Sequence, residues 1–155
     1  MSMSVEAVKN FFNEKKVSHS IISLEESSAT VSLAAAALGV SEMQIAKTLA
    51  LNVNEESIVI VTCGIAKIDN RKFKDTFHTK AKMMSFEETL EKTGHPVGGV
   101  CPFGLPKEVK IYLDESLKEL EEVYPAAGSP HSVTKISVSE LEEITEGKWI
   151  DVCKV

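Results

Sequence analysis

Cysteines are few in this sequence, and long apolar segments are missing. The three cysteines, Cys63, Cys101 and Cys153, lie far apart and match neither the ligand spacing of a zinc site nor an even-numbered disulfide framework. No apolar run approaches the roughly 18 residues needed to span a bilayer. The polar first residues do not resemble a signal peptide. We therefore expect a soluble protein of a reducing, cytoplasmic compartment that does not enter a membrane.

Several familiar catalytic patterns are also absent. The sequence has no GxSxG nucleophile motif, no P-loop, no HExxH zinc motif and no paired carboxylates of the glycosidase kind. Its glycines do not form a strand–GxGxxG–helix unit, which excludes the usual dinucleotide fingerprint. We therefore expect no metal and no cofactor, and chemistry that depends on side chains and backbone alone.

The charge balance argues against general nucleic-acid binding. The net charge is −6, whereas contacts to phosphates need Lys and Arg. DNA is therefore not an expected partner. Basic residues nevertheless gather between positions 67 and 82, and such a stripe could touch a phosphate backbone locally. On charge alone a solvated helix face is the commoner case. The basic stripe contains Lys67, Arg71, Lys72, Lys74, Lys80 and Lys82.

The chain of 155 residues, 43% of them hydrophobic, fits a single domain over residues 1–155 with one core. Strands at 48–53 and 57–63 flank a short turn and should pair as an antiparallel hairpin. Helices and strands are mixed without regular βαβ alternation, so we predict an α+β domain with a mixed, largely antiparallel sheet. The predicted helices are 5–15, 30–38, 70–77, 85–93 and 140–145, and the other strands are 17–24, 82–84, 109–113, 123–126 and 132–136.

The segment from His95 to Pro106 holds three glycines and three prolines in twelve residues. Glycines allow backbone shapes and close approaches that other residues forbid, and prolines stiffen what lies between them. Such a loop could supply backbone amides to an oxyanion or clamp a ligand. It could equally be a tight connection between a helix and a strand, and spacing alone favours neither.

Three further features could carry chemistry. Lys47 lies at the start of a strand, where it would commonly reach solvent, but in a cleft it would donate to a carbonyl, a phosphate or a ribose hydroxyl. The loop Gly128 to Ser132 brings hydroxyls and the imidazole of His131 together, and it could also be a plain surface turn. Cys101 could be a nucleophile with His95 or His131 as its base, although such a cysteine is more often a small buried apolar residue.

Three blocks together resemble the YbaK/prolyl-tRNA-synthetase-associated editing-domain family. They are Ala46 to Leu49 (AKTL), Gly94 to Gly104 (GHPVGGVCPFG) and Ala127 to His131 (AGSPH), and their order and spacing extend the resemblance over roughly residues 5–145. The resemblance implies a curved mixed sheet with surrounding helices. It also implies hydrolysis of mischarged aminoacyl-tRNA, without a metal, by a positioned water or by the thiol of a misplaced cysteine.

The resemblance also assigns roles to residues. Lys47 would hold the terminal adenosine or the aminoacyl carbonyl, and the backbone of Gly98 and Gly99 would stabilise the tetrahedral intermediate. The implied substrate-binding residues are Thr48, Val100, Cys101, Pro102, Phe103, Gly128, Ser129, Pro130 and His131. We add the prediction that the tRNA acceptor stem contacts Lys67, Arg71, Lys72 and Lys74.

The implied partners are the acceptor end of an aminoacyl-tRNA, with tRNA(Pro) carrying Cys or Ala as the leading substrate, and a prolyl-tRNA synthetase. Two alternatives stay open from the residues alone. One is a non-catalytic module of the same fold that binds tRNA ends or a small aminoacyl or nucleotide ligand. The other is a hydrolase or transferase that depends on Cys101.

Overall fold

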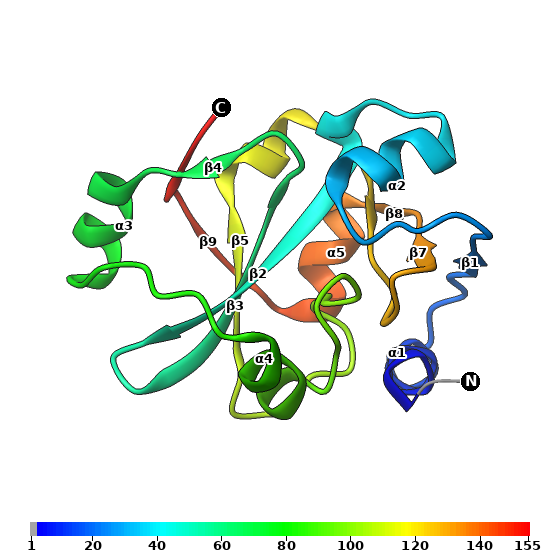
Figure 1. The fold of residues 1–155 in the computed structure, drawn as a ribbon, viewed down its shortest axis with the longest axis horizontal. Helices are drawn as coiled ribbons and strands as arrows, with labels where there is room; N and C mark the ends of the chain where they lie inside the picture. Colours follow the sequence, from blue (N-terminus) through cyan, green and yellow to red (C-terminus); the bar gives the residue numbers. More distant parts are fainter. Residues whose placement is uncertain (1–2) are drawn as a thin grey trace.

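The computed structural model describes residues 3–155 (Figure 1). Its helices are α1 Met3–Glu14, α2 Val31–Leu38, α3 Asn70–Phe77, α4 Phe86–Thr93 and α5 Val138–Thr145, with short 3-10 turns η1 Glu42–Gln44 and η2 Glu115–Glu119. The strands are β1 Ile21–Ser23, β2 Ile45–Val53, β3 Glu56–Cys63, β4 Lys67–Ile68, β5 Lys110–Asp114, β6 Glu122–Pro125, β7 Ser132–Thr134, β8 Ile136–Ser137, β9 Lys148–Ile150 and β10 Cys153–Lys154.

A six-stranded mixed sheet with the order β8-β6-β2-β3-β5-β9 forms the centre of the molecule. The β2–β3 hairpin is antiparallel, as predicted, and it is in register from Ala46 opposite Cys63 to Val53 opposite Glu56. Parallel pairing joins β2 to β6, β3 to β5, and β5 to β9, which is a larger parallel share than the sequence pattern suggests. Two small antiparallel sheets, β1–β7 and β4–β10, lie beside it.

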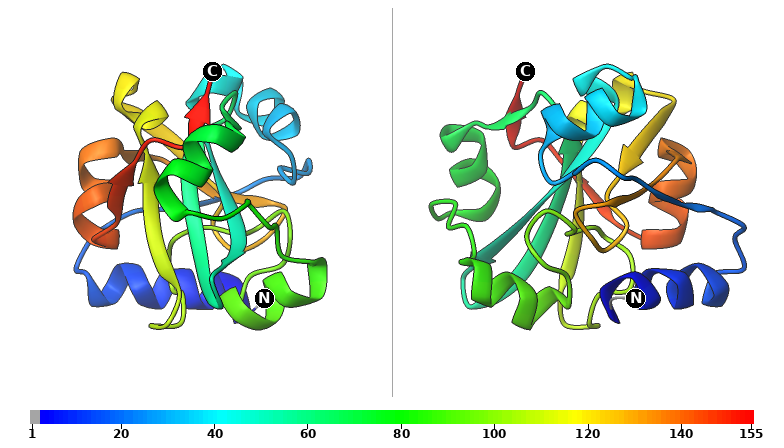
Figure 2. Two further views of the ribbon diagram at one scale, coloured as in Figure 1. Left: turned by 90° about the vertical axis from the view of Figure 1, so that its left-hand side faces the viewer. Right: turned by 45° about the vertical axis from the view of Figure 1, so that its right-hand side comes forward.

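Helices cover both faces of this sheet. In Figure 2, α5 lies on one side of the central strands, and α2 and α4 lie on the other. The main core contains Leu51, Ile60 and Leu113 from neighbouring strands. The ring of Phe12 in α1 packs 4.9 Å, centroid to centroid, from the ring of Phe103, so α1 is fixed against the long loop that follows α4. This packing makes α1 a support for that loop.

Local capping explains where several helices begin and end. Asp69 accepts hydrogen bonds from the backbone amides of Arg71 and Lys72, so α3 begins at Asn70, as predicted. Ser85 and Glu88 form a reciprocal capping box at the start of α4, and Gly94 ends it in the left-handed conformation. These signals depend only on nearby residues, which is why the sequence predicts them.

The shortest strands were harder to predict. The predicted strand over 17–24 is shortened to Ile21–Ser23, and the one over 82–84 is reduced to a single bridge between Met83 and Leu51. The strands β4, β9 and β10 were not predicted, because two or three residues carry too little periodicity. Within residues 3–155, no helix is both long and apolar enough to cross a membrane.

Candidate functional site

A cavity of about 260 Å³ lies on the sheet face beside the first half of β2. Its walls come from five separate parts of the chain, and most of the side chains are small and apolar. The lining consists of Ser28 to Val31 and Ala34, Ile45 to Thr48 and Ala50, Met83 and Thr89, Val97, Gly98 and Val100, and Tyr124, Ala126 and Val133. The cavity therefore brings together Lys47, Thr48, Gly98 and Val100, four residues that the sequence assigned to one site.

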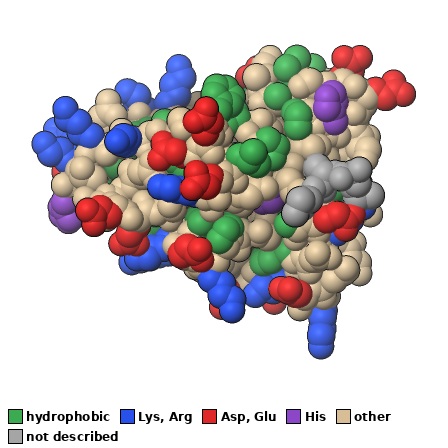
Figure 3. Space-filling view, turned by 60° about the horizontal axis from the view of Figure 1, so that its bottom comes forward, with side chains coloured by type: hydrophobic (Ala, Val, Ile, Leu, Met, Phe, Trp, Pro, Cys, Tyr) green, Lys and Arg blue, Asp and Glu red, His purple; other side chains and the backbone are tan. Residues whose placement is uncertain are grey.

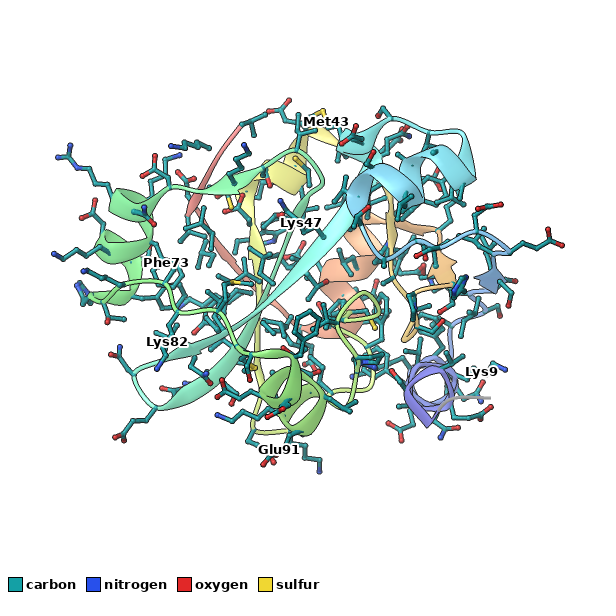
Figure 4. All side chains as sticks on the ribbon, in the orientation of Figure 1. Lys9, Met43, Lys47, Phe73, Lys82 and Glu91 are labelled. Carbon is teal, nitrogen blue, oxygen red and sulfur yellow. The ribbon has the colours of Figure 1, made fainter. Side chains whose placement is uncertain are left out.

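Lys47 is half-buried in this cavity wall. It lies well inside the molecular outline beside β2, whereas Lys9 lies near its edge (Figure 4). Its ammonium donates a hydrogen bond to the carbonyl oxygen of Ala66, with Nζ and the oxygen 2.5 Å apart. Burial lowers the pKa of Lys47, nearby Cys153 and Cys63 oppose that shift, and the positive charge of Lys67 adds to it. Lys47 thus carries a charge that is held in place rather than left mobile in solvent.

The glycine loop, residues 95–104, reaches the cavity through Val97, Gly98 and Val100. Gly98 has φ +93, a left-handed conformation that a side chain would strain. A Cβ on Gly99 would lie only 2.5 Å from the backbone nitrogen of Ser129, so this position also requires glycine. The carbonyl oxygen of Gly99 accepts a hydrogen bond of 3.1 Å from the amide of Gly128. The two loops predicted to build one site are therefore in direct backbone contact.

A buried histidine holds the glycine loop from behind. The Nδ1 atom of His95 is hydrogen-bonded to the hydroxyl of Ser4 in α1, and its Nε2 atom lies 2.7 Å from the carbonyl oxygen of Phe103. Because a carbonyl can only accept, Nε2 carries the proton and Nδ1 accepts from Ser4. Burial lowers the pKa of His95, so the ring is neutral at neutral pH. His95 is thus a structural anchor of the loop.

Cys101, Pro102 and Phe103 do not line the cavity. Cys101 and Phe103 are fully buried, and Phe103 packs on the aromatic rings of α1. Burial raises the pKa of the Cys101 thiol to about 12, and its sulfur lies 3.6 Å from Nε2 of His95, the nitrogen that carries the proton. These three consecutive residues are buried outside the cavity wall, which argues against their predicted contact with substrate and against Cys101 as a nucleophile.

The residues of the second loop, 127–132, lie partly against the glycine loop and partly at a separate depression. Pro130 approaches the glycine loop, since a Cβ on Gly98 would lie 3.5 Å from the Cβ of Pro130. Ser129 and His131 instead line a separate depression of about 340 Å³ between α1 and β1. His131 is exposed there and does not reach the cavity that holds Lys47. The structure therefore does not bring His131, which was predicted to bind substrate, into the cavity that holds Lys47.

The basic stripe begins close to Lys47 and continues over α3. Figure 3 shows Lys and Arg side chains gathered at the end of the molecule where α3 lies, with acidic side chains among them. Lys67, Arg71 and Lys74 are exposed. Lys72 already makes two hydrogen bonds, because its ammonium lies 3.1 Å from Oδ1 of Asp151 and 2.9 Å from the carbonyl oxygen of Cys153. Three of the four residues predicted to contact tRNA are thus exposed, and the contact itself stays a prediction.

Sequence analysis missed several lining residues. The most informative is Ser28, whose side chain is 6% exposed and whose hydroxyl has no hydrogen-bond partner among the described residues. The hydroxyl of Thr48 also has no hydrogen-bond partner among the described residues. Ser28 lies in an irregular polar stretch before α2, and no local spacing distinguishes it from its neighbours. Within residues 3–155, no three His, Cys, Asp or Glu side chains cluster in a way that could hold a metal ion.

The family model described as the aminoacyl-tRNA editing domain matches residues 25–144, which include every segment of the cavity wall. The chain belongs to this family. The editing domain is 46% identical over 154 residues, 98% of both chains, to a protein of Bacillus subtilis (strain 168) named "Uncharacterized protein YwhH". It is also 25% identical over 120 residues to "Putative Cys-tRNA(Pro)/Cys-tRNA(Cys) deacylase EbsC" of Enterococcus faecalis (strain ATCC 700802 / V583), covering 76% of this chain and 73% of that protein.

A solved structure shows the same fold over the full length. The editing domain superimposes with a TM-score of 0.90 and 26% identity on a protein described as "a putative trans-editing enzyme for prolyl tRNA synthetase", covering 100% of this chain and 99% of that one. The expected curved mixed sheet with surrounding helices, and the resemblance to the YbaK-type editing family, are confirmed by these comparisons.

Proposed function

We propose that this editing domain is an aminoacyl-tRNA deacylase that hydrolyses the ester of a mischarged tRNA carrying a small amino acid. The observation that carries the proposal is the cavity of about 260 Å³, in which the charged Lys47 and the glycine loop meet a wall of alanines and valines. A small apolar cavity with a few oriented polar groups suits the aminoacyl group and the terminal ribose. Membership of the editing family supports the same reaction class.

The proposed mechanism uses an attacking group that the protein does not supply. No Cys, His, Asp or Glu is among the described lining residues, and Cys101 is buried behind the loop. An aminoacyl ester is already activated, so positioning and a few dipoles can suffice. Lys47 would fix the terminal adenosine or the ester carbonyl, and the backbone around Gly98 would stabilise the oxyanion. A water assisted by the ribose 2′-hydroxyl, or the thiol of a misplaced cysteine, would attack.

The leading substrate is tRNA(Pro) carrying Cys or Ala. The names of the Enterococcus relative and of the superimposed structure, which refer to Cys-tRNA(Pro) and to prolyl-tRNA synthetase, support this choice. A prolyl-tRNA synthetase is the matching protein partner, and the exposed part of the basic stripe would contact the acceptor stem. The cytoplasmic location stays a prediction. A binding module without turnover would use the same cavity, and the absence of Cys, His, Asp and Glu from the described wall is the observation that favours it.

The deciding experiment is a deacylation assay with tRNAs charged with Ala, Cys, Ser or Pro. Wild type should hydrolyse at least one ester well above the spontaneous rate, and Lys47→Ala should lose most of that activity while its circular dichroism spectrum stays unchanged. Lys110→Ala is the matched control, because Lys110 is exposed on β5 and its ammonium pairs with Glu56. Binding of these tRNAs without any hydrolysis would replace the deacylase with the binding module.

A further inference from the structure

The carbonyl oxygen that holds Lys47 belongs to a buried turn between β3 and β4. Ala66, which is 0% exposed, accepts the hydrogen bond of the Lys47 ammonium. The amide of Ala66 donates to the carbonyl oxygen of Cys63 at 3.2 Å, and this bond closes the turn. The place of the ammonium therefore depends on how the two ends of the turn are fixed.

One carboxylate oxygen of Asp114 supports the end of the turn that follows β3. Asp114 is 1% exposed, and its Oδ2 atom accepts from the amide of Ser116 at 2.9 Å. The hydroxyl of Ser116 accepts in turn from the amide of Cys63 at 3.1 Å. Because the backbone of Ser116 is held by Asp114, its hydroxyl is presented to the last residue of β3.

The other oxygen of the same carboxylate supports the end of the turn that leads into β4. Oδ1 of Asp114 accepts from the amide of Val152 at 2.9 Å. Val152 directly precedes β10, and β10 pairs with β4 in the small antiparallel sheet near the C-terminus (Figure 1). Since β4 begins one residue after Ala66, both ends of the turn are connected to one buried carboxylate.

Side chains of both supported segments lie near the Lys47 ammonium. Burial lowers the pKa of Lys47, and Cys153 in β10 and Cys63 at the end of β3 oppose that shift. The strand β10 lies beyond residues 25–144, the part of the chain that matches the editing-domain model. The surroundings of Lys47 are thus built in part by a segment outside the matched residues.

We propose that Asp114 is a positioning residue for Lys47, and that its two carboxylate oxygens hold the β3 end and the C-terminal strand so that the Ala66 carbonyl keeps the ammonium in one place. The inference rests on the proposed function and adds to it a residue that does not line the cavity. A displacement of about 1 Å at a reacting centre can cost about a hundredfold in rate, so such a support matters for the reaction.

Chemical labelling of the amine tests the positioning without any activity. Wild type and Asp114→Asn are treated with limiting acetic anhydride, and mass spectrometry gives the acetylation rate of Lys47 relative to that of the exposed Lys110. The asparagine amide offers only one acceptor oxygen, so one of the two backbone hydrogen bonds is lost. The relative rate at Lys47 should rise by at least about threefold, the effect of losing an ordinary hydrogen bond. An unchanged rate overturns the proposal.

Ser137→Ala is the control for general destabilisation. The hydroxyl of Ser137 caps α5 by accepting from the amide of Glu140, and Ser137 does not line the cavity. The variant should lower the melting temperature and leave the labelling of Lys47 unchanged. If it raises that labelling as much as Asp114→Asn does, the effect is one of stability and the proposal is overturned.

Ser116→Ala gives the same test in a milder form, in case Asp114→Asn does not fold. It removes the acceptor of the Cys63 amide and keeps the hydrogen bond between Asp114 and Val152. The labelling of Lys47 should rise in this variant too, by a smaller factor. An unchanged rate in a folded Ser116→Ala protein, with no folded Asp114 variant, would count against the proposal and overturn it.

Steady-state deacylation separates this inference from the deacylase proposal. With a mischarged tRNA that wild type hydrolyses, Asp114→Asn should lower kcat by about tenfold or more and leave KM within about twofold, because the misplaced ammonium no longer stabilises the transition state. An unchanged kcat would overturn the inference while the deacylase stands. If wild type hydrolyses no ester but Asp114→Asn still raises the labelling of Lys47, the deacylase proposal fails and the positioning of Lys47 stands.

Discussion

The Nε2 atom of His95 lies 2.7 Å from the carbonyl oxygen of Phe103, and this hydrogen bond joins the two ends of the glycine loop across eight residues. The other ring nitrogen is bonded to Ser4 in α1. The loop that lines the cavity is therefore closed on itself and fixed to the first helix by one neutral imidazole.

We expect stability to depend on pH through His95. Burial lowers its pKa, so the unfolded chain takes up a proton at its ordinary value of about 6.5 while the folded protein does not. The free energy of unfolding that His95 contributes is thus fully present above about pH 6.5, and it is lost as the pH falls through the lower pKa of the folded state. Urea unfolding of wild type at several pH values between 8 and 5 measures this slope.

His95→Gln is the matched variant, because it keeps a polar side chain but cannot titrate in this range. It should lower the free energy of unfolding by about 1–3 kcal/mol at pH 8, since part of the buried network is lost. Its stability should fall less steeply than that of wild type below pH 6.5. Equal slopes in the two proteins would show that His95 is not the group that titrates.

The thiol of Cys101 should be unreactive in the folded protein. With its pKa raised to about 12, the reactive thiolate is a very small fraction at pH 8. All three cysteines are buried, so Ellman's reagent should modify almost none of them in the native state and all three in guanidinium chloride. Cys101→Ala should then lose one equivalent in denaturant and keep deacylase activity within about threefold of wild type. Loss of activity with an intact fold would restore the cysteine hypothesis.

Gly99→Ala should separate the two loops. The added Cβ would lie 2.5 Å from the nitrogen of Ser129 and 2.6 Å from the carbonyl carbon of Gly128, both of them backbone atoms that cannot move aside cheaply. We expect a loss of about 1–3 kcal/mol in the free energy of unfolding and at least about tenfold in activity. Gly94→Ala is the control, because its φ of +80 is strained but no atom lies within 4 Å of the new Cβ. It should cost stability and leave activity intact.

The residues of the basic stripe should differ in their effects on tRNA binding. Arg71→Ala and Lys74→Ala remove exposed charges, so each should weaken tRNA binding and reduce the salt dependence of the binding constant by about one unit of slope. Lys72→Ala should affect binding less and lower the melting temperature, because Lys72 bonds Asp151 and the carbonyl of Cys153. Equal effects of all three on binding would show that the contact with Asp151 opens when tRNA arrives.

The sequence was informative wherever a structural choice depends on near neighbours. The predicted helices 70–77 and 85–93 begin at nearby capping residues, and alternating residues on either side of Asn54 predicted the central hairpin. The parallel pairing of β3 with β5 was not visible, because it depends on segments about fifty residues apart.

Within the candidate site, the sequence located the right loops but not the direction of each side chain. Gly98 and Val100 face the cavity and Cys101 and Phe103 face the core, a difference set by packing against α1 rather than by spacing. The contact of Gly99 with Gly128 likewise exists only in the folded chain. Ser28 shows the same limit, since the burial of its hydroxyl and the lack of a hydrogen-bond partner depend on the fold around it.

The hydrogen bond from Lys47 to the carbonyl of Ala66 has a consequence for turnover. A ligand that draws the ammonium away from Ala66 exchanges one acceptor for another and leaves the carbonyl of this fully buried residue without its partner. Ligand affinity is reduced by that exchange, and the same carbonyl is ready to recover the lysine when the product leaves. An internal competitor of this kind favours rapid release over tight retention, which would suit the proposed deacylase.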